Sequence, residues 1–263
     1  MYLYLLIRQH IIPVVLTFLV TIITFLLFVD VGQTQGRAIT KERINPYVLA
    51  TQGKTIVKSG DGTTTTLDSQ QKKNIGTEDK IRTLANSSAT IFWSDGSVTR
   101  LGEKTNISVL ELKNGVNDST QVDFSISEGK SWSNLGRTMD PDSYFKQRYD
   151  NNEKVAAVRG TIFEINVEKG YLHTESHAVT IQDEKGGYLE TVPDGMSIAT
   201  DGSSIKAIDS GTLDPKWQQA NIENDAKLMQ ERLQKIQDKL KLFQSKESML
   251  REVQVYLRQL FGV

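Results

Sequence analysis

The chain of 263 residues carries 31 Lys and Arg against 32 Asp and Glu, a formal net charge of -1, and it contains no cysteine. This balance gives no overall electrostatic attraction for nucleic acid, so a nucleic-acid partner is not expected. The absence of cysteine excludes disulfides, thiolate metal sites and cysteine nucleophiles, and the length leaves room for one or two domains.

A long apolar segment near the amino terminus predicts a membrane anchor. As a helix, the run from Ile11 to Val29 would span roughly 28 Å, close to the hydrocarbon thickness of a bilayer. We predict a short amino-terminal segment at residues 1–10, a transmembrane helix at 11–30 and a linker at 31–46. A cleaved signal peptide is the alternative, which the lack of a clear small-residue cleavage site disfavours. Basic residues lie on both sides of the segment, so the positive-inside rule leaves its orientation open.

Residues 47–209 carry the pattern of a β domain, with short β-prone runs separated by turn residues. Val122, Phe124 and Ile126 alternate with polar residues, as in a strand that has one buried face. Asp95-Gly96 separates two β-prone runs and predicts a hairpin turn rather than a calcium loop.

Aromatic residues stand out at two places within this β region. Residues 139–154 combine polar residues with an aromatic cluster and are expected to form a short helix or a long exposed loop. Trp93 and Trp132 have β-branched or small polar neighbours and are expected in the core, with a sugar-stacking platform as the alternative.

The pattern changes at Asp214-Pro215, which predicts a helix start with Asp as the N-cap and Pro at the first helical position. An α-helical tail is predicted over residues 214–263, and the polar residues 245–248 predict a break between two helices. The first part of the tail carries apolar residues at a spacing of three and four. A candidate partner face consists of Met229, Leu233, Ile236 and Leu240.

Three uses of this apolar face are open. An amphipathic helix commonly packs such a face on its own domain or on a neighbouring helix. The spacing also suits self-association as a short coiled coil. Docking on another protein or on the membrane is the third use.

Four blocks of the β region, in this order and spacing, resemble the FecR-like domain of bacterial envelope proteins. They cover residues 74–83, 89–102, 122–132 and 155–165, and the last block contains Val-Arg-Gly-Thr. The residues that carry the resemblance are given structural roles and are Asp95, Gly96, Gly129, Val158, Arg159, Gly160, Thr161 and Phe163.

The resemblance implies a mainly β domain, either a twisted solenoid-like stack or a sandwich, held outside the inner membrane. It thereby implies that the short amino terminus at residues 1–10 is cytoplasmic. In the best-known members of the family, this module relays a signal from an outer-membrane receptor to a cytoplasmic tail that binds a sigma factor. Only about ten residues precede the predicted membrane helix here, so sigma-factor regulation is not carried over.

Two weaker candidate sites lie in the β region. His173, Glu175 and His177 alternate, so a strand would place them on one face as a metal trio, for which a solvated strand face is the alternative. Arg159 is either a paired structural cation or a ligand-binding guanidinium. Pairing is favoured, because burial of an unpaired charge is costly.

The sequence contains no motif of a serine hydrolase, metalloprotease, P-loop enzyme or dinucleotide-binding enzyme. We therefore expect no catalytic residue, no cofactor and no enzymatic activity. The leading interpretation is a single-pass inner-membrane protein whose extracytoplasmic FecR-like domain serves envelope binding or signal coupling, with an envelope protein or glycan as partner. The alternative is a structural scaffold or cell-wall-contact protein that assembles through its helical tail.

Overall fold

The computed structural model describes residues 45–114, 119–135, 143–149, 151, 153–158, 160–200, 206–207 and 210–261. The chain divides into two compact units, Met1–Arg43 and Ile44–Val263, and all of these residues belong to the second unit. The predicted membrane helix at 11–30 and nearly all of the predicted linker lie outside them. Within the described residues, no helix is long and apolar enough to cross a membrane.

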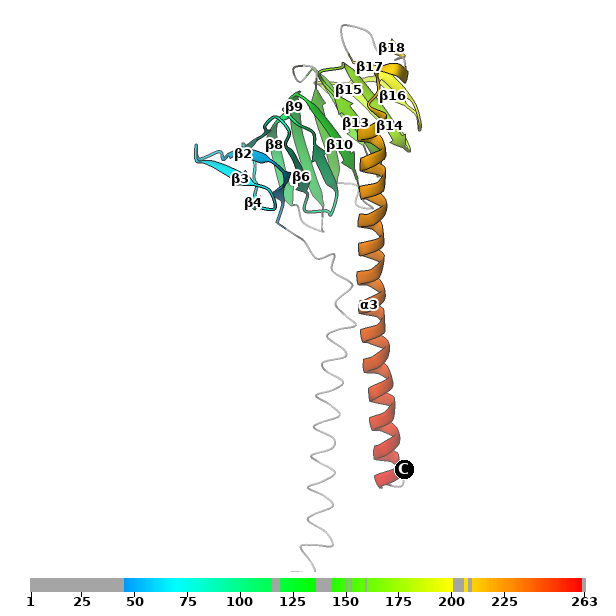
Figure 1. The fold of residues 1–263 in the computed structure, drawn as a ribbon. Coiled ribbons are helices and arrows are strands. Elements are labelled where there is room, and N and C mark those ends of the chain that lie inside the picture. Colours follow the sequence, from blue (N-terminus) through cyan, green and yellow to red (C-terminus); the bar gives the residue numbers. More distant parts are fainter. Residues whose placement is uncertain are drawn as a thin grey trace, which may run out of the picture. The chain divides into compact units, whose positions relative to one another are not determined.

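Two β-sheets face each other as a sandwich, which is one of the two architectures expected from the sequence (Figure 1). In spatial order, sheet A consists of β18 (Lys206–Ala207), β17 (Ser197–Ala199), β14 (Tyr171–Ser176), β13 (Ile162–Asn166), β10 (Lys130–Asn134), β7 (Val98–Leu101), β6 (Ser88–Phe92), β1 (Tyr47–Gln52) and β4 (Lys72–Asn74). Sheet B consists of β16 (Tyr188–Val192), β15 (Val179–Asp183), β12 (Lys154–Val158), β11 (Tyr144–Tyr149), β9 (Thr120–Glu128), β8 (Asn106–Asn114), β5 (Lys80–Thr83), β2 (Lys54–Lys58) and β3 (Thr64–Asp68).

The apolar core lies between the facing sheets, where alternate residues of each strand point inward. Trp93, just after β6, is fully buried and stacks on Phe124 with 5.2 Å between the ring centroids. Phe145 meets both rings edge-on, at 6.0 Å from Trp93 and 5.5 Å from Phe124. Trp132 is also fully buried, so neither tryptophan offers a surface on which a sugar could stack.

A polar bridge crosses this apolar core. Gln147 of β11, in sheet B, is fully buried between two serines of β10, in sheet A. Its amide nitrogen donates to the Ser131 hydroxyl at 2.5 Å, and its amide oxygen accepts from the Ser133 hydroxyl at 3.2 Å. Because a buried amide without partners is costly, these bonds favour one relative position of the two sheets.

The expectation of a helix or loop at residues 139–154 is wrong for the part that the structure describes. Strand β11 occupies Tyr144–Tyr149 and pairs in parallel with β9 and antiparallel with β12, whereas the remaining described strand pairs are antiparallel. Phe145, Gln147 and Tyr149 are its buried positions. A glutamine and a tyrosine at inward positions weaken the apolar alternation by which a strand is recognised in sequence.

Helix α3 (Pro215–Phe261) follows the short 3-10 helix η3 (Ser210–Thr212) and has 47 residues, which corresponds to a length of about 70 Å. The Asp214 carboxylate caps it by accepting the Trp217 N–H at 3.2 Å. The predicted break at residues 245–248 is wrong, because the helix is continuous there. Those residues are Ser, Lys, Glu and Ser, and without Pro or Gly they cost a helix little.

Candidate functional site

The outer face of sheet A carries a row of residues at directly opposite strand positions. Arg100 of β7 lies opposite Trp132 of β10, Trp132 lies opposite Glu164 of β13, and Glu164 lies opposite His173 of β14. Residues directly opposite in neighbouring strands point to the same face of a sheet. Arg100, Trp132 and Glu164 are hydrogen-bonded to residues of α3, so the first turns of this helix cover these three residues.

Asp225 of α3 is the buried anion of this contact. One carboxylate oxygen accepts the Arg100 guanidinium at 2.5 Å, and the other accepts the Trp132 indole N–H at 2.9 Å. Both side chains of the ion pair are nearly buried, with 12% of Arg100 and 9% of Asp225 exposed. A buried pair of this kind depends on both members, because the loss of one leaves an uncompensated charge in the contact.

Glu164 is a second buried carboxylate beneath the helix, and it is bound by neutral donors. It is fully buried, and it accepts the Tyr171 hydroxyl at 2.6 Å and the Gln218 side-chain amide at 3.0 Å. Burial raises the pKa of Glu164 against the opposing effect of these two hydrogen bonds. Burial and the neighbouring Glu164 carboxylate together raise the pKa of Tyr171. The carboxylate of Glu164 is therefore enclosed by the contact with the helix and is not accessible to a substrate.

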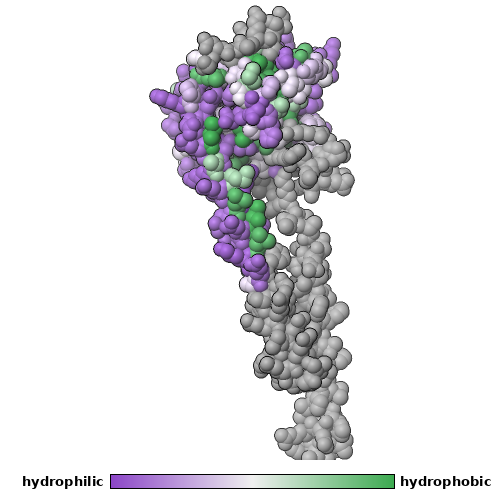
Figure 2. Space-filling model, turned by 90° about the vertical axis from the view of Figure 1, so that its right-hand side faces the viewer, coloured by the Kyte–Doolittle hydropathy of each residue, from purple (hydrophilic) through white to green (hydrophobic). Residues whose placement is uncertain are grey.

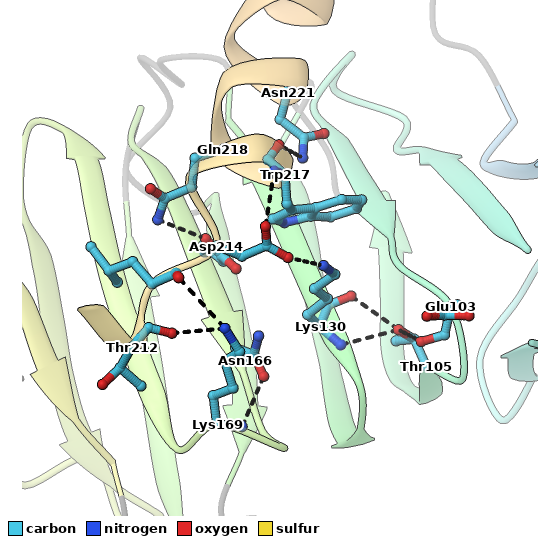
Figure 3. A network of polar contacts seen from close by, with 12 residues as sticks. Glu103, Thr105, Lys130, Asn166, Lys169, Thr212, Asp214, Trp217, Gln218 and Asn221 are labelled. Carbon is cyan, nitrogen blue, oxygen red and sulfur yellow. Dashed lines mark hydrogen bonds and ion pairs between the residues drawn. The ribbon is translucent and has the colours of Figure 1, made fainter. Parts of the chain in front are cut away.

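The start of α3 is held by two lysines (Figure 3). The Lys130 ammonium donates to the Asp214 carboxylate at 2.7 Å and lies 4.5 Å from the centroid of the Trp217 ring. The Lys169 ammonium donates to the Thr212 carbonyl at 2.9 Å. Burial opposes the ionisation of Asp214, but the Lys130 ammonium and the Trp217 N–H outweigh it and lower the pKa of Asp214. These contacts cap the helix and hold its first turn on sheet A.

One stripe of α3 makes the contact with the sandwich, and it is mostly polar. Asn221 is almost fully buried, and the Arg232 guanidinium donates to the Gly96 carbonyl in the turn between β6 and β7. The spacing of three and four residues matches one face of a helix. We call this set the docked stripe, and it consists of Trp217, Gln218, Asn221, Asp225, Leu228 and Arg232.

A different stripe of α3 is apolar and exposed. We call it the apolar seam, and it consists of Met229, Leu233, Ile236 and Leu240, which are exposed by 57%, 50%, 54% and 54%. Figure 2 shows hydrophobic residues gathered along this helix. At 3.6 residues per turn, the seam lies about 80° around the helix from the docked stripe. The helix does pack on its own β domain, but mainly through polar residues, which the spacing of apolar residues along the sequence does not reveal.

A groove with a volume of about 510 Å³ runs beside the docked stripe, between α3 and the outer face of β1, β6 and β7. Leu49, Phe92 and Leu101 line its sheet side, and Leu228 and Lys227 line its helix side. The groove lies on the opposite side of the docked stripe from the apolar seam, so the two surfaces are separate.

The structure does not assemble the candidate metal trio. His173 Nδ1 bonds the Ser197 hydroxyl at 2.7 Å, and its Nε2 lies 3.3 Å from the Glu175 carboxylate. His177 follows the end of β14 with a φ of 66° and bonds Ser176, so it leaves the alternation of the strand. Across the residues that the structure describes, no three His, Asp or Glu side chains group closely enough to hold a metal ion.

Most of the residues that carry the FecR-like resemblance take structural positions. Val158 and Phe163 are buried in the core, and the Thr161 hydroxyl donates to a main-chain carbonyl just before β15 at 3.1 Å. Gly160 has a φ of 67°, in the left-handed region that favours glycine. Arg159 lies outside the described residues.

The remaining residues of this set, Asp95, Gly96 and Gly129, lie in turns between strands. Asp95 accepts the Ser97 N–H at 2.8 Å and the Ser97 hydroxyl at 2.7 Å, and Gly96 has a φ of 85° in the turn between β6 and β7. Gly129 has a φ of 76° between β9 and β10. Each of these residues therefore shapes a turn.

Comparisons with known proteins give distant structural similarity. No protein-family profile matches the chain, and no curated protein matches it. Two crystal structures of a candidate anti-sigma factor from Parabacteroides distasonis, at 2.50 and 1.65 Å resolution, are 16% and 18% identical to it, with TM-scores of 0.39 and 0.38. Each similarity covers 50% of this chain and 60% of the other, so the chain spans about three fifths of those chains.

Proposed function

We propose that this chain is a non-catalytic coupling module in which the β-sandwich holds a long helix and offers the apolar seam to a protein partner. The observation that carries the proposal is that one face of α3 binds the sandwich while a different face is apolar and exposed. The buried polar side chains of the docked stripe bond to residues of sheet A, whereas Met229, Leu233, Ile236 and Leu240 are exposed. Apolar side chains gathered in this way on a soluble surface are typical of an interaction site.

We further propose that the module belongs to the FecR-like family and is anchored in the inner membrane by residues 11–30, with the sandwich outside the cytoplasm. The four ordered sequence blocks and the apolar amino-terminal segment support this proposal. In such an arrangement, force or conformational change at the partner would reach the sandwich through α3.

The non-catalytic character is supported by the use of the acidic groups. Asp225 and Glu164 are covered by the helix and bound to neighbouring donors, and Asp214 is paired with Lys130. A general acid or base needs access to its substrate, which the buried carboxylates of Asp225 and Glu164 lack.

A structural scaffold is the second candidate function. It is favoured by the three-and-four spacing of the apolar seam, because the same spacing lets two copies of a helix pack together. In that case the partner is a second chain, and the sandwich is a spacer or a cell-wall contact.

One labelling experiment in cells of the native host tests two parts of the proposal. These are that the sandwich lies outside the cytoplasm and that a partner covers the apolar seam. The chain has no cysteine, so single variants Ser203→Cys, Glu231→Cys and Leu233→Cys report cleanly on a membrane-impermeant maleimide. We expect intact cells to label Ser203→Cys and Glu231→Cys but to protect Leu233→Cys, which should label once the full chain is purified. Glu231 is the matched control, because it is exposed on the far side of α3 from the seam.

Two outcomes would contradict the proposal. Labelling of all three variants only after lysis would place the sandwich in the cytoplasm. Equal labelling of Leu233→Cys and Glu231→Cys in intact cells would mean that nothing covers the seam.

A further inference from the structure

Within the described residues, three carboxylates bond across the contact between sheet A and the α3 segment, and two of them are paired with cations. Asp225 binds the Arg100 guanidinium at 2.5 Å, and Asp214 binds the Lys130 ammonium at 2.7 Å. Glu164 differs, because no Lys, Arg or His in the described part of the chain forms an ion pair with it. Its charge is therefore the one that costs most to bury in this contact.

The partners of Glu164 suit a neutral carboxyl group as well as a charged one. Glu164 is fully buried, and it accepts the Tyr171 hydroxyl at 2.6 Å and the Gln218 amide at 3.0 Å. A protonated carboxyl group can still accept from Tyr171, and it can donate to the amide oxygen of Gln218 once that amide is turned round. The neutral form thus keeps both hydrogen bonds without burying a charge.

The titratable groups around Glu164 come from β10, β14 and the α3 segment, and they are Lys130, Tyr171, His173, Asp214 and Asp225. The Lys130 ammonium favours the ionised form of Glu164, but it is bound to Asp214, whose charge has the opposite effect. His173 lies directly opposite Glu164 in the sheet, with its Nε2 at 3.3 Å from the Glu175 carboxylate. Burial has the largest effect, and it raises the pKa of Glu164.

Docking of α3 and the protonation of Glu164 are therefore linked. When α3 leaves the sheet, the Glu164 carboxyl group returns to water and to its ordinary pKa, so the docked state holds the proton more tightly. Below that ordinary pKa the contribution of Glu164 to docking is complete, and it is lost as the pH rises through the raised pKa. Asp214 has the opposite sign, because its pKa is lowered and its contribution is lost in acid.

We propose that α3 is a pH-dependent arm of the sandwich, which docks most tightly when Glu164 is protonated and is released more readily as the pH rises. The other two carboxylates of the contact keep their cations over this range, so Glu164 is the group that responds. Release of the docked stripe would free the helix from the direction in which sheet A holds it. This inference goes beyond the proposed function, since it does not depend on what covers the apolar seam.

The test follows maleimide labelling of the purified full chain in detergent from about pH 5.5 to about pH 8. Asn221→Cys probes the buried docked stripe, and Gln219→Cys, exposed on the other side of α3, corrects for the pH dependence of the thiol itself. We expect the ratio of the Asn221→Cys rate to the Gln219→Cys rate to rise at least roughly threefold, since one proton changes an equilibrium by up to about tenfold per pH unit. A ratio that stays constant would contradict the proposal.

Three variants identify the responsible group. Glu164→Gln, which keeps the shape of the side chain without the charge, should hold the ratio low at every pH. Tyr171→Phe removes a donor that favours the ionised form, so the rise should move to higher pH. His173→Gln is the control and should leave the rise in place. A persistent rise in Glu164→Gln, or its loss in His173→Gln, would assign the effect to another group, and equal loosening at every pH in the Glu164 and Tyr171 variants would show a packing role alone.

Discussion

Replacing Asp225 with alanine should release α3 from sheet A and lower the free energy of unfolding by about 3 kcal/mol. The change leaves the Arg100 guanidinium, which is only 12% exposed, without its carboxylate. It also leaves the buried Trp132 indole N–H without its acceptor at 2.9 Å. Two buried donors then lack partners, and the helix can relieve that cost only by moving away and admitting water.

Urea denaturation of the full chain followed by tryptophan fluorescence measures this effect. Trp132 and Trp217 lie in the contact with α3, whereas Trp93 lies in the core of the sandwich. Asp238→Ala is the matched control, because that exposed aspartate contacts only Gln234 of its own helix among the described residues. Equal stability of the Asp225→Ala and Asp238→Ala variants would show that the buried ion pair does not hold the helix.

Replacing Gly129 with alanine should destabilise the sandwich by about 3 kcal/mol or more. Gly129 has a φ of 76°, which a residue with a side chain rarely adopts. An added Cβ would lie 2.6 Å from the Cα of Thr105 and 2.4 Å from its hydroxyl oxygen. The first of these atoms belongs to the backbone, so the clash can be relieved only by shifting the chain at Thr105.

Gly62→Ala separates the clash from the backbone strain. Gly62 has a φ of 87°, but no atom lies within 4 Å of the Cβ that alanine would add. We expect that variant to lose only about 1 kcal/mol, the cost of the left-handed conformation. Thermal unfolding of both variants measures the difference, and similar losses for the two would contradict the close packing of Gly129 on Thr105.

Much of the fold could be predicted from local patterns. The alternation of Val122, Phe124 and Ile126 follows the strand period, and Asp214-Pro215 is a start signal that a helix uses directly. Both depend on residues close together in the chain. Strand β11 was not predicted because Gln147, a polar residue, occupies an inward position. Its bonds to β10 form only when the two sheets face each other, so no local pattern indicates them.

Only one part of the candidate site, the apolar seam, could be predicted from the sequence, for a related reason. The apolar seam has a periodicity that one helix carries by itself. The docked stripe is polar, and its meaning depends on partners far away in the chain, since Arg100 and Asp225 are 125 residues apart. Opposite charges at that separation have no local signature, so the sequence indicated only the seam, with packing on its own domain as one of three open uses.

A cysteine scan along α3 of the purified full chain tests the central claim, that a polar stripe docks the helix and leaves the apolar seam in solvent. Single variants Asn221→Cys and Leu228→Cys probe the docked stripe, and Met229→Cys, Leu233→Cys and Ile236→Cys probe the seam. We predict that the seam cysteines react with maleimide at nearly the rate measured in urea, and that Asn221→Cys reacts roughly tenfold more slowly. Fast labelling of Asn221→Cys, or slow labelling of the seam cysteines at every dilution of the protein, would contradict the account.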